Sequence, residues 1–349
     1  MEGKMKVAIM TDVAKIELTE REIPAPKADE VLVKVEYVGV CGSDLHYYEA
    51  GAIGVNVVKP PFVLGHEAGG TVVEVGENVT HLKAGDKVAL EPGKTCGKCE
   101  FCRTGRYNLC PDVIFFATPP VDGVFQEYVA HEAGLCFKIP DNMDTMEAAL
   151  IEPLAVGFHA ARQGNAKAGM TAAVTGAGCI GLVTMMALRA MGVSRVIAVD
   201  VMPKRLEKAL ELGATNVING QEQNTVAELL KLTNGMGPDL IIETAGAEIT
   251  TRQAIQAVKK GGTIVLVGYS PSGEMSLPMS LALDKEITFK TVFRYRHIYP
   301  MAIEAVASGR VNLKGIVTDV FMLDDIQNAM DQSVKNKADI VKSVIKIAD

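Results

Sequence analysis

The stretch Thr171-Ala-Ala-Val-Thr-Gly-Ala-Gly-Cys-Ile-Gly181 decides the fold of one half of this chain. A short apolar run leads into a G-x-G-x-x-G pattern, and an uncharged helical run follows it. A second apolar run, Val196-Ile-Ala-Val-Asp200, ends in an acidic residue 19 positions after Gly181. In this context Gly176 allows a tight turn, and Gly178 lets the backbone approach a pyrophosphate closely. Gly181 permits close packing of the helix on the strand. The stretch therefore predicts a dinucleotide-binding unit.

The acidic residue also predicts which dinucleotide is bound. The Asp200 carboxylate is placed to accept hydrogen bonds from the adenine ribose hydroxyls. A 2′-phosphate beside it would meet a like charge, so NAD is expected in preference to NADP. Arg205, five residues later, weakens this preference slightly.

Apolar runs at 216–219, 239–243 and 263–267 alternate with helical segments after Asp200, which predicts a parallel, doubly wound α/β sheet. The first third of the chain instead shows short alternating strands, separated by Gly and Pro clusters, and predicts a β-barrel-like domain. Its expected strands lie at 31–37, 71–75, 87–90 and 124–128.

The end of the chain is too short for a core of its own. The roughly 58 residues after Thr291 are therefore expected to pack back onto the first domain, with a final strand at 342–347. We predict a catalytic domain of residues 1–152 and 292–349, and a dinucleotide-binding domain of residues 153–291. A strand at 287–292 is a candidate for pairing across a two-fold axis between subunits.

The charge balance excludes one class of partner. The 349 residues carry a formal net charge of −7, so no general basic surface is available for a nucleic acid. Charges spread through residues 1–20 fit no signal peptide, and glycines interrupt the uncharged stretch 168–188, so neither a leader nor a membrane span is predicted. We expect a cytoplasmic protein with no membrane partner.

Four of the seven cysteines, Cys96, Cys99, Cys102 and Cys110, fall within 15 residues. Without an export signal these thiols should stay reduced, so the cluster predicts a metal site in place of disulfides. Four thiolates suit tetrahedral zinc and leave no position open for a substrate, which predicts a structural zinc ion in a lobe of residues 94–111. An iron–sulfur cluster is the alternative.

A second, dispersed set of donors consists of Cys41, the neighbours His66 and Glu67, and Glu152. Three such ligands with one open position are typical of catalytic zinc. On a regular strand His66 and Glu67 would point to opposite faces. Either the chain is irregular there, or Glu152 is the third ligand; the sequence leaves both open.

The segment Gly65-His-Glu-Ala-Gly-Gly70, followed by Gly76 and Val79, resembles the zinc signature of the medium-chain dehydrogenase/reductase family. Cys41-Gly-Ser-Asp-Leu-His46, the four-cysteine lobe and the glycine fingerprint occur in that family's order. The resemblance covers essentially the whole chain. It implies a GroES-like catalytic domain and a Rossmann domain.

Within the family, the chain resembles the sorbitol (polyol) dehydrogenase branch in four segments: 46–51, 117–123, 149–153 and 292–295. In that branch Cys41, His66 and Glu67 would bind the catalytic zinc, and Glu152 would hold the zinc-bound water or exchange into the metal's coordination. Tyr47, Glu152, Arg294 and Tyr295 match positions that contact the substrate. Besides the three glycines, the positions that match cofactor contacts are Ile180, Asp200, Arg205, Val267, Gly268, Tyr269, Val292, Phe293 and Arg294. The branch also implies a homo-oligomer, a dimer or a tetramer.

These expectations add up to a mechanism with two zinc ions per chain. The catalytic zinc would acidify a polyol hydroxyl, and hydride would pass to NAD⁺ to give a ketose, reversibly. Ser43 would accept the hydroxyl proton and pass it through the cofactor ribose to His46, while Glu152 acts at the metal. The alternatives are an L-threonine 3-dehydrogenase-like or another secondary-alcohol dehydrogenase and, more distantly, a non-catalytic zinc module.

Overall fold

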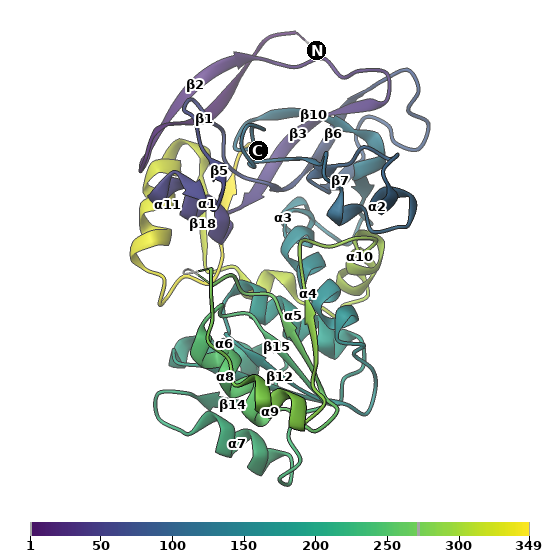
Figure 1. Ribbon diagram of the computed structural model, residues 1–349. Helices are drawn as coiled ribbons and strands as arrows, with labels where there is room; N and C mark the ends of the chain where they lie inside the picture. Colours follow the sequence, from purple (N-terminus) through teal and green to yellow (C-terminus); the bar gives the residue numbers. More distant parts are fainter. Residues whose placement is uncertain (1, 271–272, 349) are drawn as a thin grey trace. The chain divides into compact units, whose positions relative to one another are not determined.

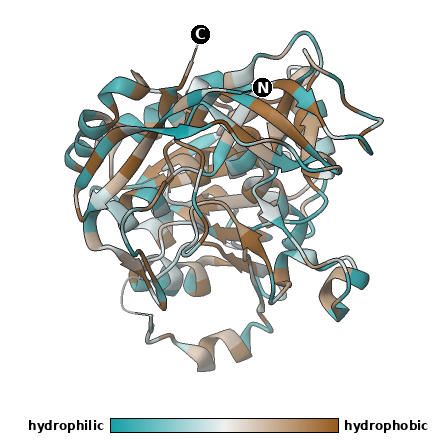
Figure 2. Ribbon diagram, turned by 90° about the horizontal axis from the view of Figure 1, so that it is seen from above, coloured by the Kyte–Doolittle hydropathy of each residue, from teal (hydrophilic) through white to brown (hydrophobic). Residues whose placement is uncertain are grey.

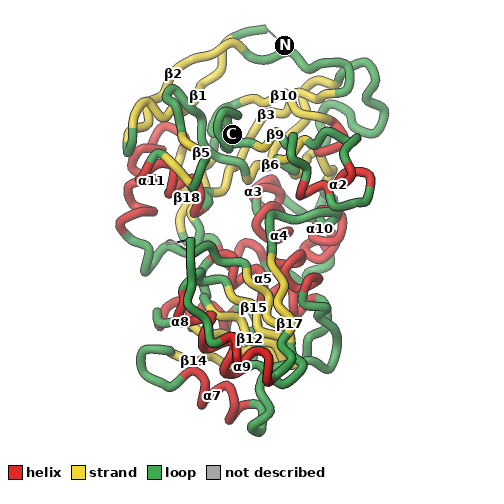
Figure 3. The backbone as a smooth tube through the Cα atoms, in the orientation of Figure 1, coloured by secondary structure: helices red, strands yellow, loops and turns green. Residues whose placement is uncertain are grey.

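The computed structural model describes residues 2–270 and 273–348, which form two compact units. Unit 1 comprises Met1–Glu152, Tyr299–Ala307 and Val317–Asp349, and unit 2 comprises Pro153–Ile298 and Ser308–Ile316. Each unit is built around its own sheet (Figures 1 and 3).

Unit 2 is the parallel sheet with its helices, and it confirms the predicted doubly wound fold. Its six strands lie in the order β14-β13-β12-β15-β16-β17, so the order reverses between β12 and β15. Every neighbouring pair is parallel. The strands are β12 (Thr171–Thr175), β13 (Arg195–Asp200), β14 (Asn216–Asn219), β15 (Leu240–Glu243), β16 (Thr263–Leu266) and β17 (Thr288–Thr291). The helices are α5 (Cys179–Ala190), α6 (Pro203–Glu211), α7 (Thr225–Leu232), α8 (Glu248–Ala257) and α9 (Met279–Asp284).

Parallel strands covered on both faces are apolar along their whole length, and these strands follow that rule. Ala173, Ile197, Ile241 and Ile264 are fully buried in one hydrophobic core. Figure 2, coloured by hydropathy, shows several strands that are brown, and so hydrophobic, over part of their length. The uncharged stretch 168–188 divides into β12, a glycine turn and most of α5. No helix in the described part of the chain is long and apolar enough to cross a membrane.

Unit 1 contains a seven-stranded sheet whose strands lie in the order β11-β7-β6-β3-β19-β18, with β10 pairing to β3. These strands are β3 (Glu30–Gly39), β6 (Glu67–Val75), β7 (Lys87–Leu90), β10 (Tyr128–Glu132), β11 (Cys136–Lys138), β18 (Asp319–Met322) and β19 (Ser343–Lys346). Separate hairpins are β1 (Lys4–Asp12) with β2 (Lys15–Glu22), β4 (Ala52–Ile53) with β5 (Asn56–Val57), and β8 (Gly93–Lys94) with β9 (Ile114–Phe115). The helices are α1 (Gly42–Ala50), α2 (Glu100–Arg103), α3 (Thr145–Ala149), α10 (Tyr299–Ala307) and α11 (Ile326–Lys335), and α4 (Ile151–Gln163) begins at the end of this unit.

The end of the chain returns to the first sheet. The strand expected at 342–347 is β19, and it pairs antiparallel with β3, with Val344 opposite Gly39. The predicted domain limits, 1–152 with 292–349 and 153–291, stay a prediction. The compact units differ from them in residues 292–298 and 308–316, which group with the parallel sheet. A physical reason is that Val292 donates its N–H to Leu266 O at 3.0 Å, which continues the pairing of β17 with β16.

The strand predicted at 124–128 is wrong, because β10 begins only at Tyr128. Residues 123–125 instead donate backbone N–H groups to the carbonyls of residues 63–65. Phe125 O also accepts the N–H of Ala8. This segment is therefore held by the irregular chain before β6 and by β1, which alternation of side chains cannot reveal.

The fingerprint glycines have the packing that their roles require. Gly176 has φ +92°, which favours glycine, and a Cβ on Gly181 would lie within hard contact of Gly176 O. The first turn of α5 therefore lies directly on the loop that follows β12.

Gly181→Ala is expected to lower the free energy of unfolding by about 1–3 kcal/mol, because the added methyl must push α5 away from the loop. Gly134→Ala is the matched control, since nothing lies within 4 Å of its Cβ position. Denaturant unfolding of both variants checks this. Equal stability of the two variants would contradict the close packing at Gly181.

Candidate catalytic metal centre and dinucleotide site

Three predicted metal ligands come together in unit 1. One ligand atom each from Cys41, His66 and Glu67 lies within 4.8 Å of the other two. Cys41 is the N-cap of α1, and the two neighbours lie where β6 begins. Gly65, with φ +89°, precedes them outside regular strand geometry. The chain is therefore irregular at this point, and both neighbouring side chains reach the same centre.

A buried carboxylate that sequence reasoning did not assign ties the two segments together. Asp44 is fully buried, and its two oxygens accept the backbone N–H of Cys41 at 3.0 Å and of Gly65 at 2.9 Å. Its Oδ1 also lies 3.7 Å from Nδ1 of His66. A signal was present, because an acidic residue three positions after a helix N-cap is typical of a capping box.

The charges at this centre favour a cation. Burial alone would lower the pKa of His66, but interactions with the Asp44 carboxylate and the Cys41 side chain hold that pKa well above its usual value. Burial would raise the pKa of Asp44, yet His66 and the two backbone N–H groups keep it below its usual value. A sulfur, a nitrogen and an oxygen donor beside a buried carboxylate fit a zinc ion.

Glu67 has a second partner that was not predicted. Nζ of Lys342 lies 2.5 Å from Glu67 Oε2 and donates to Val40 O at 2.9 Å. Both side chains of the ion pair are at least 98% buried, and a Cβ on Gly39 would overlap the same carboxylate oxygen. Lys342 adjoins β19, so only the return of the chain end to β3 brings it here.

Lys342→Met is expected to lower the free energy of unfolding of the metal-free protein by about 3–5 kcal/mol, because it leaves the Glu67 carboxylate buried without its cation. Lys4→Met removes a lysine from an exposed pair with Glu20 and should change little. Urea unfolding in the presence of a chelator measures both. A loss no larger at Lys342 than at Lys4 would contradict the role given to the buried pair.

The other predicted catalytic residues of unit 1 lie on two helices. Ser43 and His46 are one turn apart on α1, with Ser43 partly buried and His46 exposed, and Tyr47 on the same helix is buried. Glu152 is 6% exposed in the first turn of α4 and does not belong to the group formed by Cys41 and its two partners.

Arg294 and Tyr295 lie in unit 2, after β17. The Arg294 guanidinium lies 4.8 Å from the ring centroid of Phe293, and Tyr295 is buried. Arg294 has φ +54°, an uncommon backbone conformation for a residue with a side chain.

The four cysteines form the second candidate metal group, and their sulfurs also lie within 4.8 Å of one another. Cys99 Sγ is 3.4 Å and Cys96 Sγ is 4.0 Å from Cys102 Sγ. Bonds of 2.3 Å in a tetrahedron place sulfurs about 3.8 Å apart, so the cluster has the size of a zinc site. Backbone N–H groups of Lys98 and Cys99 lower the pKa of Cys96 to about 7. All seven cysteines are free thiols.

The predicted cofactor residues gather at one edge of the parallel sheet. The fingerprint follows β12, Asp200 ends β13, Val267 to Tyr269 follow β16, and Val292 to Arg294 follow β17. The carboxyl ends of parallel strands meet at the same edge, and a dinucleotide binds there at the point where the strand order reverses. Gly178 is the N-cap of α5, so the free N–H groups of this helix follow the glycine loop.

Two contacts refine this site. Asp200 Oδ2 accepts the N–H of Ala177 at 2.6 Å, and Oδ1 accepts those of Val201 and Met202. The carboxylate therefore also fixes the glycine loop, which the sequence did not suggest. A Cβ on Gly178 would lie 3.8 Å from Nη1 of Arg205, so this cation stands beside the loop.

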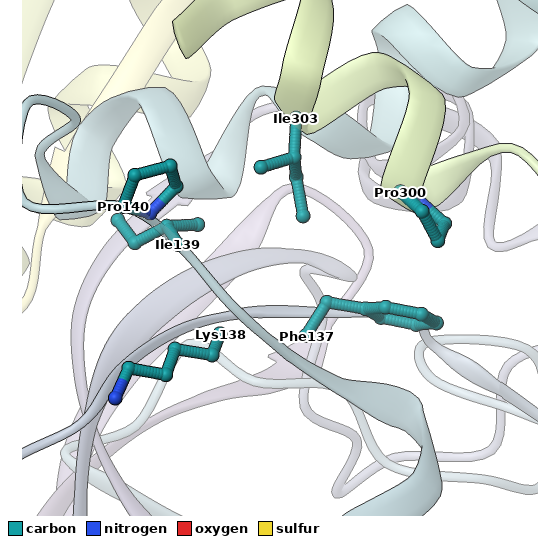
Figure 4. Close-up of a pocket in the computed structure, with 6 residues that line it drawn as sticks. All are labelled: Phe137, Lys138, Ile139, Pro140, Pro300 and Ile303. Atoms are coloured by element: carbon teal, nitrogen blue, oxygen red, sulfur yellow. The ribbon is translucent and has the colours of Figure 1, made fainter.

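Unit 1 contains a hollow of about 430 Å³, and no residue of either candidate metal group lines it (Figure 4). It is lined by Phe137, Lys138, Ile139, Pro140, Pro300 and Ile303. No predicted site residue is among them. Its one cation, Lys138, is paired with Asp86 at 2.7 Å, and the hollow offers none of the chemistry described above.

Comparison with other proteins agrees with this geometry. Residues 27–141 match the model of the alcohol dehydrogenase GroES-like domain, and residues 179–308 match that of the zinc-binding dehydrogenase family. Sorbitol dehydrogenase of Bacillus subtilis is 44% identical over 98% of this chain and 97% of its own. The matches confirm the GroES-like expectation for the first domain.

Two solved structures are similar over nearly all of the chain. An oxidoreductase/dehydrogenase of unknown specificity from Escherichia coli shares 46% identity and a TM-score of 0.96, over 99% of this chain and 100% of that one. A zinc-binding dehydrogenase from Sinorhizobium meliloti, bound to NADP, is 31% identical with a TM-score of 0.92, over 99% of this chain and 100% of that one.

Proposed function

Because this chain belongs to the zinc-containing medium-chain dehydrogenase/reductase family, in its sorbitol dehydrogenase branch, we propose that it oxidises a polyol to a ketose with NAD⁺, reversibly. The observation that carries the proposal is the convergence of Cys41, His66 and Glu67 on one centre, in a chain with a complete dinucleotide fingerprint. A sulfur, an imidazole and a carboxylate leave one zinc position for substrate.

The residues divide the chemistry between them. A bound zinc ion supplies a Lewis acid that acidifies the substrate hydroxyl, and the nicotinamide accepts hydride. Cys41, His66 and Glu67 would hold the ion, with Asp44 orienting His66. Ser43 would accept the hydroxyl proton, and His46, one turn further and exposed, would release it to solvent.

Glu67, not Glu152, is our choice for the third ligand. Its oxygen lies within the group of Cys41 and His66, which supports this choice. We propose that Glu152 acts beside the metal, on the water or the substrate bound there. The four cysteines would hold a second, structural zinc ion.

Two zinc ions per chain are therefore expected in the isolated protein. Cys41→Ala should lose activity together with the catalytic zinc ion, and should retain the ion held by the four cysteines. Cys99→Ala should retain the other ion, with lower stability. Elemental analysis of the purified variants measures this. One ion in the unmodified protein, or iron with sulfide in the lobe, would contradict the assignment.

The preference for polyols rests on Tyr47, Arg294 and Tyr295 as partners for several hydroxyls. Buried donors of this kind penalise a substrate that leaves them unpaired. The preference for NAD rests on Asp200, whose negative charge would oppose a 2′-phosphate. The positive charge of Arg205 would instead attract a 2′-phosphate, so NADP⁺ is tested beside NAD⁺.

NADH formation with sorbitol, xylitol, galactitol, L-threonine and ethanol, each repeated with NADP⁺, tests the substrate and the cofactor together. We expect kcat/KM for the best polyol to exceed that for ethanol by about 100-fold or more, with NAD⁺ preferred. Comparable turnover of ethanol would refute the polyol assignment, and preference for L-threonine would favour the threonine-type alternative.

We also propose that the protein is a cytoplasmic homo-oligomer. Its free thiols suit a reducing compartment. β17 is the edge strand of the parallel sheet, and Met279 and Leu283 of α9 are 50% and 75% exposed. Pairing of β17 across a two-fold axis would cover this edge in a dimer or tetramer.

A further inference from the structure

Two consecutive peptide groups begin the glycine loop of unit 2, one between Thr175 and Gly176 and one between Gly176 and Ala177. They lie at the end of β12. The N–H of Gly176 donates to Val199 O at 2.8 Å. The N–H of Ala177 donates to Asp200 Oδ2 at 2.6 Å. Both acceptors belong to β13, so this neighbouring strand holds the N–H side of each peptide group.

Thr244, the residue that follows β15, holds the carbonyl side of the same two peptide groups. Its N–H and its hydroxyl both donate to Thr175 O, each at 2.9 Å. The hydroxyl also lies 3.1 Å from Gly176 O, close enough to share its proton between the two carbonyl oxygens. β13 and β15 are the two neighbours of β12 in the sheet. Each peptide group is therefore held from both sides.

These contacts restrain the chain where it is least restrained by its own side chains. Gly176 has φ +92° and lacks a side chain that would resist rotation of the peptide groups beside it. Its carbonyl oxygen lies against the first turn of α5, at Gly181. The free N–H groups that attract a pyrophosphate belong to this same turn. The direction of the Gly176 carbonyl therefore affects the group that would bind phosphate.

Glu243, the last residue of β15, fixes the backbone around Thr244. Its side chain is fully buried, and Oε1 accepts the N–H groups of Ala245 at 2.9 Å and Gly246 at 3.0 Å. The hydroxyl of Thr250, in the first turn of α8, donates to the same oxygen at 2.8 Å. The chain is thus held on both sides of Thr244, and its side chain projects from a fixed point.

We propose that Thr244 is a positioning residue for the dinucleotide, whose hydroxyl orients the glycine loop so that α5 presents its N–H groups to the pyrophosphate. Asp200 would also contact the adenine ribose, whereas Thr244 would act through the backbone of the loop. Loss of the Thr244 hydroxyl should therefore weaken NADH and NADPH alike. The inference rests on the proposed function only in so far as that function places a dinucleotide at this edge of the sheet.

The test compares Thr244→Val with two control variants in the full-length, zinc-loaded protein. Thr244→Ser retains the hydroxyl. Thr233→Val removes the hydroxyl of another half-buried threonine of unit 2, which donates to Leu229 O at 2.6 Å at the end of α7. We expect Thr244→Val to raise the Kd of NADH about fivefold, the value of one hydrogen bond, and the controls to keep the original Kd. Titration of NADH fluorescence measures each Kd.

A pair of smaller ligands separates positioning of the loop from general stability. ADP-ribose contains the pyrophosphate, whereas adenosine contains no phosphate. In displacement of NADH, Thr244→Val should weaken ADP-ribose about fivefold and adenosine by less than about twofold, because only the first ligand needs the oriented N–H groups. General loosening of unit 2 would weaken both ligands to the same degree.

Four results would overturn the proposal: an unchanged Kd of NADH in Thr244→Val, an equal rise in Thr233→Val, equal losses for ADP-ribose and adenosine, or a changed preference between NADH and NADPH. These titrations require no turnover. A protein that showed the expected changes in Kd, yet failed to oxidise polyols, would contradict the proposed substrate while supporting the role of Thr244. A protein that bound no dinucleotide would contradict both.

Discussion

The candidate catalytic centre depends on the two backbone hydrogen bonds that the Asp44 carboxylate accepts. This carboxylate receives N–H groups from Cys41 at the start of α1 and from Gly65 before β6, and it lies beside His66. One fully buried charge thus joins two segments that are 21 residues apart in sequence. Burying it without these partners would be costly, so the fold that satisfies Asp44 also brings the metal donors together.

The second requirement is the reversal of strand order in the parallel sheet. The parallel direction of the six strands places the glycine loop, Asp200 and the segments after β16 and β17 at one edge, and the strand order reverses there between β12 and β15. Asp200 serves the loop as well as the expected ribose, because it accepts the N–H of Ala177. The Asp200 carboxylate would therefore combine support of the backbone with recognition of the ribose, and Asp44 likewise supports the backbone, beside a proposed zinc ligand.

The sequence predicted those features that are formed by residues close to one another along the chain. The doubly wound sheet, the four-cysteine group and the glycine fingerprint each follow from residues within one segment. It left open the choice between Glu67 and Glu152, because that choice depends on an irregular backbone at Gly65. Lys342 could not be predicted as a partner of Glu67, since it arrives with the last strand from the far end of the chain. For the same reason the segment 124–128 does not form the strand that its alternation predicts, because distant backbone groups hold it.

The central claim is that one metal ion is bound jointly by Cys41, His66 and Glu67. A crystal structure of the purified protein, with anomalous data collected on both sides of the zinc absorption edge, tests it most directly. We predict one peak bonded to the Cys41 sulfur, a His66 ring nitrogen and a Glu67 oxygen, and another among the four cysteines. A peak coordinated by Glu152 while Glu67 stays on Lys342, or no peak between Cys41 and His66, would contradict it.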